Sequence, residues 1–261
     1  MSTTRVPKGL LVPVILAVAF LCAPLLGLLA RIPWERALHV LGDEAVLDAL
    51  LLSLWSATAA SGIAFCLGLP LAVWLAAGHD RRRTVTRVLV LMPMVLPPVV
   101  VGVALLFAYG NSGVFGPLLD AWLGAPLPFH TAGVVLAQSY VALPFLVLAI
   151  EAGLRALDPG PAEAAATLGA GPWRVLTTVT LPSIAPALGT GALLAWARAL
   201  GEFGATITFA GNLAGETRTL PLAVFTTLET DPPAALVLGF VLILCSATVL
   251  FVLRRQWFPQ R

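Results

Sequence analysis

Long apolar stretches separated by short polar segments run through the whole chain. A helix needs about 20 apolar residues to cross the roughly 30 Å hydrocarbon core of a bilayer. Six stretches reach that length: Leu10–Ala30, Val46–Ala77, Val88–Tyr109, Thr131–Gly153, Ile184–Phe209 and Ala234–Leu253. The second is long enough to tilt or to extend beyond the bilayer. The pattern predicts an all-α membrane protein with about six transmembrane helices.

Composition agrees with this prediction. Apolar residues make up 59% of the 261 residues and charged residues only 11%, whereas a soluble domain has about 25% charged residues. No connecting segment is long enough to fold as a separate catalytic domain, so we expect one transmembrane domain over residues 1–261. The first stretch follows Arg5 and Lys8 like a signal peptide. Its length, its two prolines and the lack of a clear cleavage site favour an uncleaved span.

The distribution of lysine and arginine predicts the orientation. With the N-terminus inside, the cytoplasmic segments hold 11 of the 15 cations and the opposite side holds three, namely Arg31, Arg36 and Arg218. Cytoplasmic segments carry the excess of positive residues in membrane proteins. We therefore expect both termini to face the cytoplasm, in a protein of the cell (inner or plasma) membrane.

The sequence lacks the motifs of a self-powered or catalytic protein. The only lysine is Lys8, so a nucleotide-binding G-x-x-x-x-G-K-[ST] loop is absent. The histidines lie in separate loops, and the three cysteines lie in apolar spans, where packing is their usual role. We expect no catalytic residue, metal or cofactor in this chain, contact with lipid but not with nucleic acid, and an energy source in another polypeptide.

The predicted cytoplasmic loop at residues 154–182 is not composed like a simple linker. Pro159 and Pro161 suit the first turn of a helix, and Glu163 favours the positive end of its dipole. Gly169 is well placed to end this helix in a left-handed cap, and a second short helix follows Gly171-Pro172. Residue chemistry alone leaves two readings open: a projection that sits in a partner's groove, or an amphipathic connector without a partner.

This loop resembles the signature of permease subunits of ABC-type importers. That signature reads E-A-A, three residues, G, nine residues, an aliphatic, one residue and L-P. It matches at Glu163, Ala164, Ala165, Gly169, Val179, Leu181 and Pro182. The resemblance covers about residues 46–250 and implies the type I importer permease fold. It also implies docking of the loop onto cytosolic ABC ATPase subunits, which bind ATP and magnesium.

Two further segments resemble the permeases that import tetrahedral oxyanions. They are Gly201-Glu-Phe-Gly-Ala205 in the fifth stretch and Met92-Pro-Met-Val-Leu-Pro-Pro98 in the third, and Gly215–Leu222 resembles the molybdate branch. The resemblance implies a molybdate importer with an extracytoplasmic molybdate-binding protein and a second copy of the chain as partners. Tungstate has nearly the same size and charge, and sulfate or thiosulfate is the other alternative. A stand-alone ion channel would have no use for the Glu163 loop.

The candidate translocation path lies in the third and fifth stretches. Pro97 and Pro98 remove backbone donors and predict a kink or break, which is tolerated in a membrane where it lines a cavity. Arg198 and Glu202 are four residues apart, so they would share one helix face, which Thr206 extends. This face either lines the path of a dianion or holds a structural ion pair.

The remaining readings concern packing and the outer loops. Ala197, Gly201 and Ala205 form a small-residue strip on the fifth stretch, suited either to packing within one subunit or to a dimer contact. The loops Asn111–His130 and Asn212–Pro233 contain short apolar runs. These runs are expected to form interfacial helices that receive a binding protein, or a simple lid. Arg218 is expected to pair with Glu216 rather than to bind an anion.

Overall fold

The computed structural model describes residues 7–124 and 126–257, and all the regular secondary structure in that part of the chain is helical. Four helices are long and apolar enough to cross a membrane alone: α1 (Leu11–Ala30), α3 (Glu44–Ala76), α7 (Thr131–Arg155) and α14 (Pro232–Trp257). Two bent helix pairs raise the number of candidate spans to six. The predicted all-α architecture is confirmed.

Helix α7 is the centre of the bundle. It packs against α3 on one side and α11 (Ala185–Leu200) on another, and most of its length is buried. The contact with α3 is close because α3 buries mainly small residues, such as Ala57, Ala60 and Ala64. A Cβ atom on Gly68 would lie 2.6 Å from Leu146 Cδ2 of α7. Small residues let membrane helices approach each other closely where no water drives their association.

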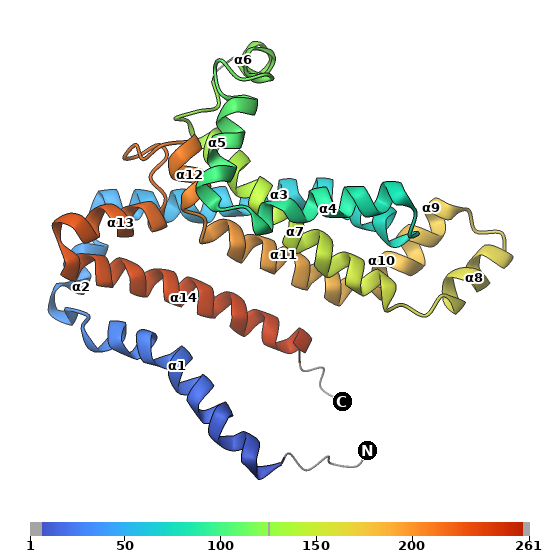
Figure 1. The fold of residues 1–261 in the computed structure, drawn as a ribbon, viewed down its shortest axis with the longest axis horizontal. Coiled ribbons are helices and arrows are strands. Elements are labelled where there is room, and N and C mark those ends of the chain that lie inside the picture. The colour runs from blue at the N-terminus through green and yellow to red at the C-terminus, as the bar shows by residue number, and fades with distance from the viewer. Residues whose placement is uncertain (1–6, 125, 258–261) are drawn as a thin grey trace.

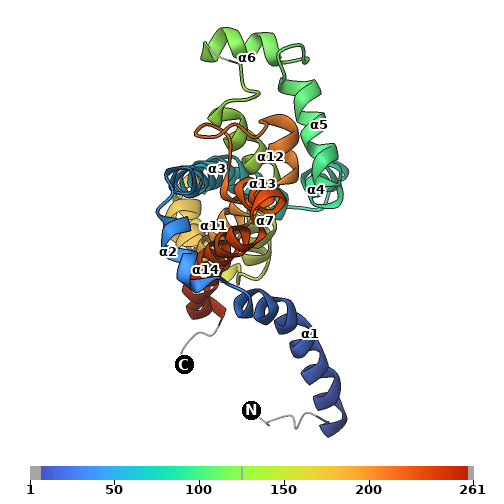
Figure 2. The same cartoon turned by 90° about the vertical axis from the view of Figure 1, so that its left-hand side faces the viewer.

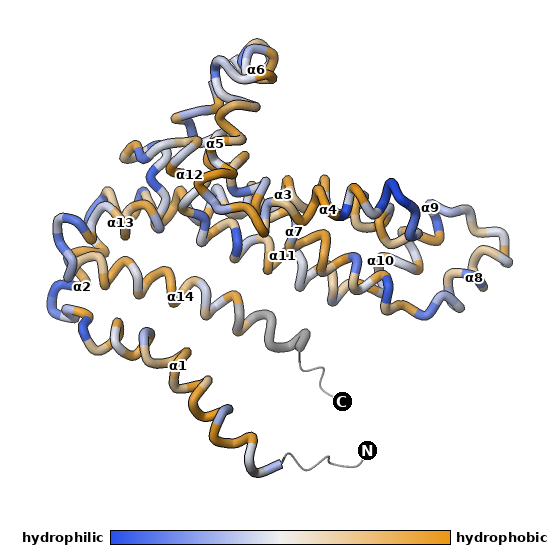
Figure 3. The backbone as a smooth tube through the Cα atoms, viewed as in Figure 1, coloured by the Kyte–Doolittle hydropathy of each residue, from blue (hydrophilic) through white to orange (hydrophobic). Residues whose placement is uncertain are grey.

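The bundle has two distinct ends. Helix α3 has 33 residues, about 50 Å of helix, so it extends beyond the hydrocarbon core. One end carries α8 (Gly160–Thr167) and α9 (Pro172–Val175), and the other carries α2 (Trp34–Leu41) and α13 (Leu220–Thr230) (Figure 1). We call them the α8 end and the α13 end. The most hydrophilic segments lie at these two ends (Figure 3).

Helix α1 stands apart from the bundle, with no buried residue, and α5 (Pro98–Tyr109) and α6 (Gly116–Leu123) extend away on the opposite side (Figure 2). The described start of α1 and the described end of α14 both point towards the α8 end (Figure 1). The described start of α1 and the described end of α14 thus lie on one side of the bundle.

The third predicted span is broken, as its prolines indicate. Helix α4 (Arg81–Val95) ends before Leu96 and Pro97, and α5 leaves it at an angle of 117°. A proline disfavours the helical conformation of the residue before it. Pro97 therefore constrains Leu96, and Pro98 constrains Pro97, and both adopt extended ψ angles of 140° and 135°. The chain must turn here.

The fifth predicted span is not the single helix expected over Ile184–Phe209. Helix α11 ends at Leu200, and α12 (Gly204–Phe209) begins after an irregular segment. At its other end α11 meets a helical stretch over Pro172–Ser183 at 73°. This stretch contains α9, a π-helical turn (Leu176–Thr180) and α10 (Leu181–Ser183). The prediction of one continuous helix was wrong, because residues 201–203 are not helical and the Glu202 side chain accepts a hydrogen bond from the Ala205 amide instead.

The two apolar runs predicted to form helices in the outer loops correspond to α6 and α13. Helix α13 buries Leu220, Leu222 and Ala223 against α14 and α3, so it covers the end of the bundle. Helix α6 makes few contacts, and its Trp122 is 85% exposed. The two helices therefore differ: α13 packs onto the bundle, whereas α6 projects from it.

Candidate functional site

The predicted loop at residues 154–182 is a pair of short helices at the α8 end of the bundle. Helix α8 places Glu163 in its first turn, and the Asp158 carboxylate accepts a hydrogen bond from the Gly160 amide at 3.0 Å. Helix α8 ends in the predicted left-handed cap, because Gly169 has a φ of 89°. The Gly169 amide donates to the Ala166 carbonyl and the Ala170 amide to that of Ala165, each at 3.0 Å. This pair of bonds is a Schellman cap.

The surface of this loop is exposed and partly apolar. Glu163, Ala164 and Gly169 are exposed, and Ala165 is half-buried. Leu168 is 89% exposed and Trp173 of α9 is 76% exposed. Ala166, Trp173 and Val73 of α3 also border a groove of about 740 Å³ between the loop and the bundle. Large apolar side chains exposed outside the apolar spans indicate a protein contact surface.

The last two residues of the matched motif lie where the loop rejoins the bundle. Leu181 and Pro182 form the start of the single turn α10, directly before α11. Leu181 packs against the main core cluster, whereas Pro182 is exposed. The loop is therefore connected to the start of α11 through α10.

The breaks of the third and fifth spans meet each other. A Cβ atom on Gly204, the first residue of α12, would lie 2.6 Å from Pro98 Cβ at the start of α5. One turn further along α5, a Cβ atom on Gly102 would lie 2.5 Å from Thr208 Cβ and 2.9 Å from the Ala205 carbonyl oxygen. We call this contact between α5 and α12 the break junction. Only glycine permits so close an approach of two backbones.

Arg198 and Glu202 form the predicted ion pair, at 2.5 Å between Arg198 Nη1 and Glu202 Oε2. Their geometry differs from the prediction. Glu202 lies beyond the end of α11, and its Oε1 accepts a hydrogen bond from the Ala205 amide at 2.7 Å. The carboxylate therefore joins the two helical segments rather than sharing one helix face with Arg198. Its side chain is 1% exposed and that of Arg198 is 27% exposed, so the cation is the accessible partner.

Thr206 and the small-residue strip are affected by the same break. Thr206 lies in α12, fully buried, and its hydroxyl has no hydrogen-bond partner within the described chain. Ala197 belongs to α11, Gly201 to the break and Ala205 to α12, so they do not form one continuous strip. The predictions of a shared face for Thr206 and the ion pair, and of one small-residue strip, were wrong because both assumed an uninterrupted helix.

A second ionic cluster was missed by sequence reasoning. Glu151 of α7 is 5% exposed and accepts hydrogen bonds from Arg87 of α4 at 2.6 Å and from Arg155 at 2.9 Å. Arg87 and Glu151 are 64 residues apart, so only the fold brings them together. The one available signal was Glu151 itself, an acidic residue within an apolar stretch, which is costly unless it is paired.

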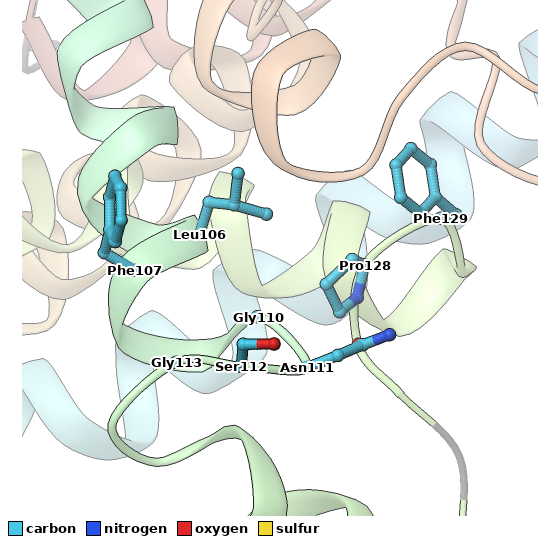
Figure 4. Close-up of a pocket in the computed structure, with 8 residues that line it drawn as sticks. All are labelled: Leu106, Phe107, Gly110, Asn111, Ser112, Gly113, Pro128 and Phe129. Atoms are coloured by element: carbon cyan, nitrogen blue, oxygen red, sulfur yellow. The ribbon is translucent and has the colours of Figure 1, made fainter.

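A small pocket, with no charged residue among those that border it, lies where α5 ends. It has a volume of about 350 Å³ and is bordered by Phe107 at the end of α5, the turn at Asn111 and Ser112, and Phe129 (Figure 4). Arg218 lies elsewhere in this region, where its Nε donates to the Asn212 side-chain oxygen at 2.9 Å. Glu216 instead faces His130 at 3.8 Å. The expected Arg218–Glu216 pair is thus not formed, and this pocket has no cation that would attract an anion.

The apolar spans, the exposed helical loop at one end and the contact between two broken spans define a multi-span membrane transport subunit. Residues 68–258 match the family described as "Binding-protein-dependent transport system inner membrane component". The chain belongs to this family of importer permeases. It is a multi-pass protein of the cell membrane and a transport subunit, not an enzyme. Transporters of this kind use ATP in a separate ATPase subunit and receive substrate from a binding protein.

Individual relatives agree with this assignment. The chain is 43% identical over 246 residues to the molybdenum transport system permease protein ModB of Mycobacterium tuberculosis, covering 94% of this chain and 93% of that protein. It is 40% identical over 197 residues to the corresponding protein of Haemophilus influenzae, covering 74% and 86%. A bacterial alginate ABC transporter matches the fold at a TM-score of 0.73 and 18% identity, covering 95% of this chain and 91% of that one.

Proposed function

We propose that the chain is the membrane-spanning permease subunit of an ATP-driven importer that carries molybdate into the cell. The observation that supports this most directly is its 43% identity, over nearly its whole length, to a permease named for molybdenum transport. In this proposal residues 1–261 form one permease domain. The α8 end and both termini face the cytoplasm, and the α13 end faces an extracytoplasmic molybdate-binding protein.

In this proposal two regions of the structure have different tasks, docking to the ATPase and gating of the path. The loop over residues 154–182 projects the exposed Glu163 and Ala164 and the half-buried Ala165 for docking to cytosolic ATPase subunits, which bind ATP and magnesium. Gly169 ends the docking helix, and Leu181 and Pro182 connect it to α11. Two copies of the chain would enclose the path between them and open it to one side at a time. Pro97 and Pro98, with α12, form the gate.

Arg198 is the residue that we expect to meet the anion. The Arg198 side chain is partly exposed, whereas the Glu202 carboxylate is buried and hydrogen-bonded to α12. An anion in the path would therefore meet the positive partner of the pair. Arg198→Ala is expected to lower uptake about ten-fold or more, because the dianion would lose the cation that lowers its cost of crossing the membrane interior. Uptake of radioactive molybdate, with the amount of assembled transporter as reference, measures this loss.

A double variant separates the path role from a structural one. Arg198→Leu combined with Glu202→Gln removes both charges and leaves no unpaired ion. If the pair only holds α11 and α12 together, the double variant recovers assembly and uptake. The path proposal instead expects normal assembly without recovery of uptake, and full uptake in Arg198→Ala would contradict it.

Competition between anions tests the proposed cargo. The purified permease is reconstituted with its ATPase subunit and binding protein, and molybdate uptake is measured with excess tungstate or sulfate. We expect tungstate to compete nearly as well as molybdate because the two dianions have nearly the same size. We expect sulfate, the smaller anion, to compete poorly. Equal competition by sulfate would assign the chain to the sulfate branch, and ATP-independent flux would indicate a channel.

A further inference from the structure

Three helix ends meet around one buried carboxylate at the α8 end of the bundle. Glu151 Oε1 lies 2.6 Å from Arg87 Nη2 and 2.8 Å from Arg155 Nη2, and the Nε atoms of both arginines also donate to it, at 3.1 and 2.9 Å. Glu151 belongs to α7 and Arg87 to α4. The Glu151 side chain is 7% exposed, whereas the side chains of Arg87 and Arg155 are 26% and 32% exposed. The cluster is therefore centred on the anion.

The same arginines also hold the end of α3. Arg87 and Arg155 each donate to the Leu75 carbonyl, at 3.4 and 3.3 Å, and this carbonyl belongs to the last turn of α3. Carbonyls of a last helical turn have no partner within their own helix. Arg155 additionally lies 2.6 Å from His79 Nε2 in the connection between α3 and α4. Without Glu151, two cations would remain beside each other with no anion between them.

The position of the cluster in the chain connects both parts of the proposed machine. Arg155 is the last residue of α7, and the docking helix α8 begins at Gly160. On the other side, α4 leads directly to the Pro97 break and to α5, which packs against α12. The cluster thus lies between the loop and the gate, and it is a polar link from α7 to α4.

We propose that Glu151 is a positioning residue that couples movement of the docking loop to the gate by holding α4 to α7. The proposal rests on the proposed function of the chain as an ATP-driven permease. Salt-bridge networks and rigid helices carry coupling between sites, whereas a loosened contact absorbs a displacement. When an uncharged side chain replaces Glu151, Arg87 and Arg155 repel each other. Helix α4 then no longer moves with the docking loop.

Replacement of Glu151 by glutamine tests this role in the assembled transporter. Glu151→Gln keeps the side-chain volume but removes the charge. We expect the complex with the ATPase subunit to form normally and to hydrolyse ATP, while the amount of anion imported per ATP falls about ten-fold, within the usual range of coupling between sites. Glu151→Asp keeps the charge and should recover part of this ratio. A merely structural residue would lower complex yield, hydrolysis and uptake together.

The chain offers a matched control on α4. Arg87→Gln removes the cation that links α4 to the cluster and should reproduce the Glu151→Gln ratio. Arg82→Gln makes the same change on the same helix, at an exposed residue with no ion pair among the described residues, and should leave the ratio unchanged. Equal ratios in the wild type, Glu151→Gln and Arg87→Gln would overturn the proposal.

A second measurement does not depend on the cargo. Spin labels on Thr167 of α8 and Phe107 of α5, in a chain without its three native cysteines, report the distance between the docking loop and α5, the helix that follows the Pro97 break. We expect ATP binding to change this distance in the otherwise wild-type complex and not in Glu151→Gln. The same change in both would overturn the coupling role. If wild-type complexes respond to ATP but import no molybdate, the proposed cargo fails while the role of Glu151 is still decided.

Discussion

A chain carrying Glu163→Lys is expected to lose its ATPase partner and with it all import. Glu163 is exposed in the first turn of α8 and makes no ion pair among the described residues. Reversing its charge therefore leaves the packing of the bundle intact. The change places a cation at the positive end of the helix dipole, where an anion is favoured by about 0.3–1 kcal/mol. It also reverses the charge of the docking surface. Co-purification with the ATPase subunit, measured per folded permease, should fall at least about ten-fold.

A matched substitution at the opposite end of the bundle controls for this experiment. Glu35 lies in the first turn of α2, which has eight residues like α8, and it is also exposed. Glu35→Lys makes the same change of charge and the same dipole conflict, but at the α13 end. It should leave the ATPase bound. Loss of the ATPase in both variants, or in neither, would contradict the assignment of α8 as the docking helix.

The sequence was most informative where a local residue determines the backbone. Apolar length identified the spans, Pro97 and Pro98 identified the break between α4 and α5, and Gly169 identified the left-handed end of α8. The break and the helix end follow from the conformational limits of one or two residues, and the spans follow from apolar length alone. They required no knowledge of which helices are neighbours.

The features that sequence reasoning missed depend on tertiary contacts. No proline marks the break after Leu200, which is stabilised when Glu202 bonds to the Ala205 amide and Gly204 packs against Pro98. The Arg87–Glu151 pair joins residues from two separate helices. Periodicity can place a charged residue on a helix face, but it cannot show which partner the fold brings to it. The cluster around Glu151 and the geometry of the break junction could therefore be found only in the structure.

The break junction predicts a large effect from one methyl group. In Gly102→Ala the new Cβ would lie 2.5 Å from Thr208 Cβ, 2.9 Å from the Ala205 carbonyl oxygen and 3.1 Å from Ala205 Cα. The last two atoms are backbone and cannot rotate away, so α5 and α12 must separate. Such overpacking costs about 1–3 kcal/mol. We expect import to fall about ten-fold or more, measured as anion uptake by assembled transporter.

Gly62 of α3 provides the comparison that isolates this contact. It also lies inside a helix, but a Cβ atom there would meet nothing within 4 Å. Alanine favours a helix over glycine by about 1 kcal/mol, so both variants should strengthen their own helix. Gly62→Ala should keep full uptake and raise the thermal stability slightly. Because α5 reaches the bundle mainly through α12, Gly102→Ala should disturb the gate while the α3–α7–α11 core stays folded. Equal uptake in the two variants would show that transport does not depend on close packing at the break junction.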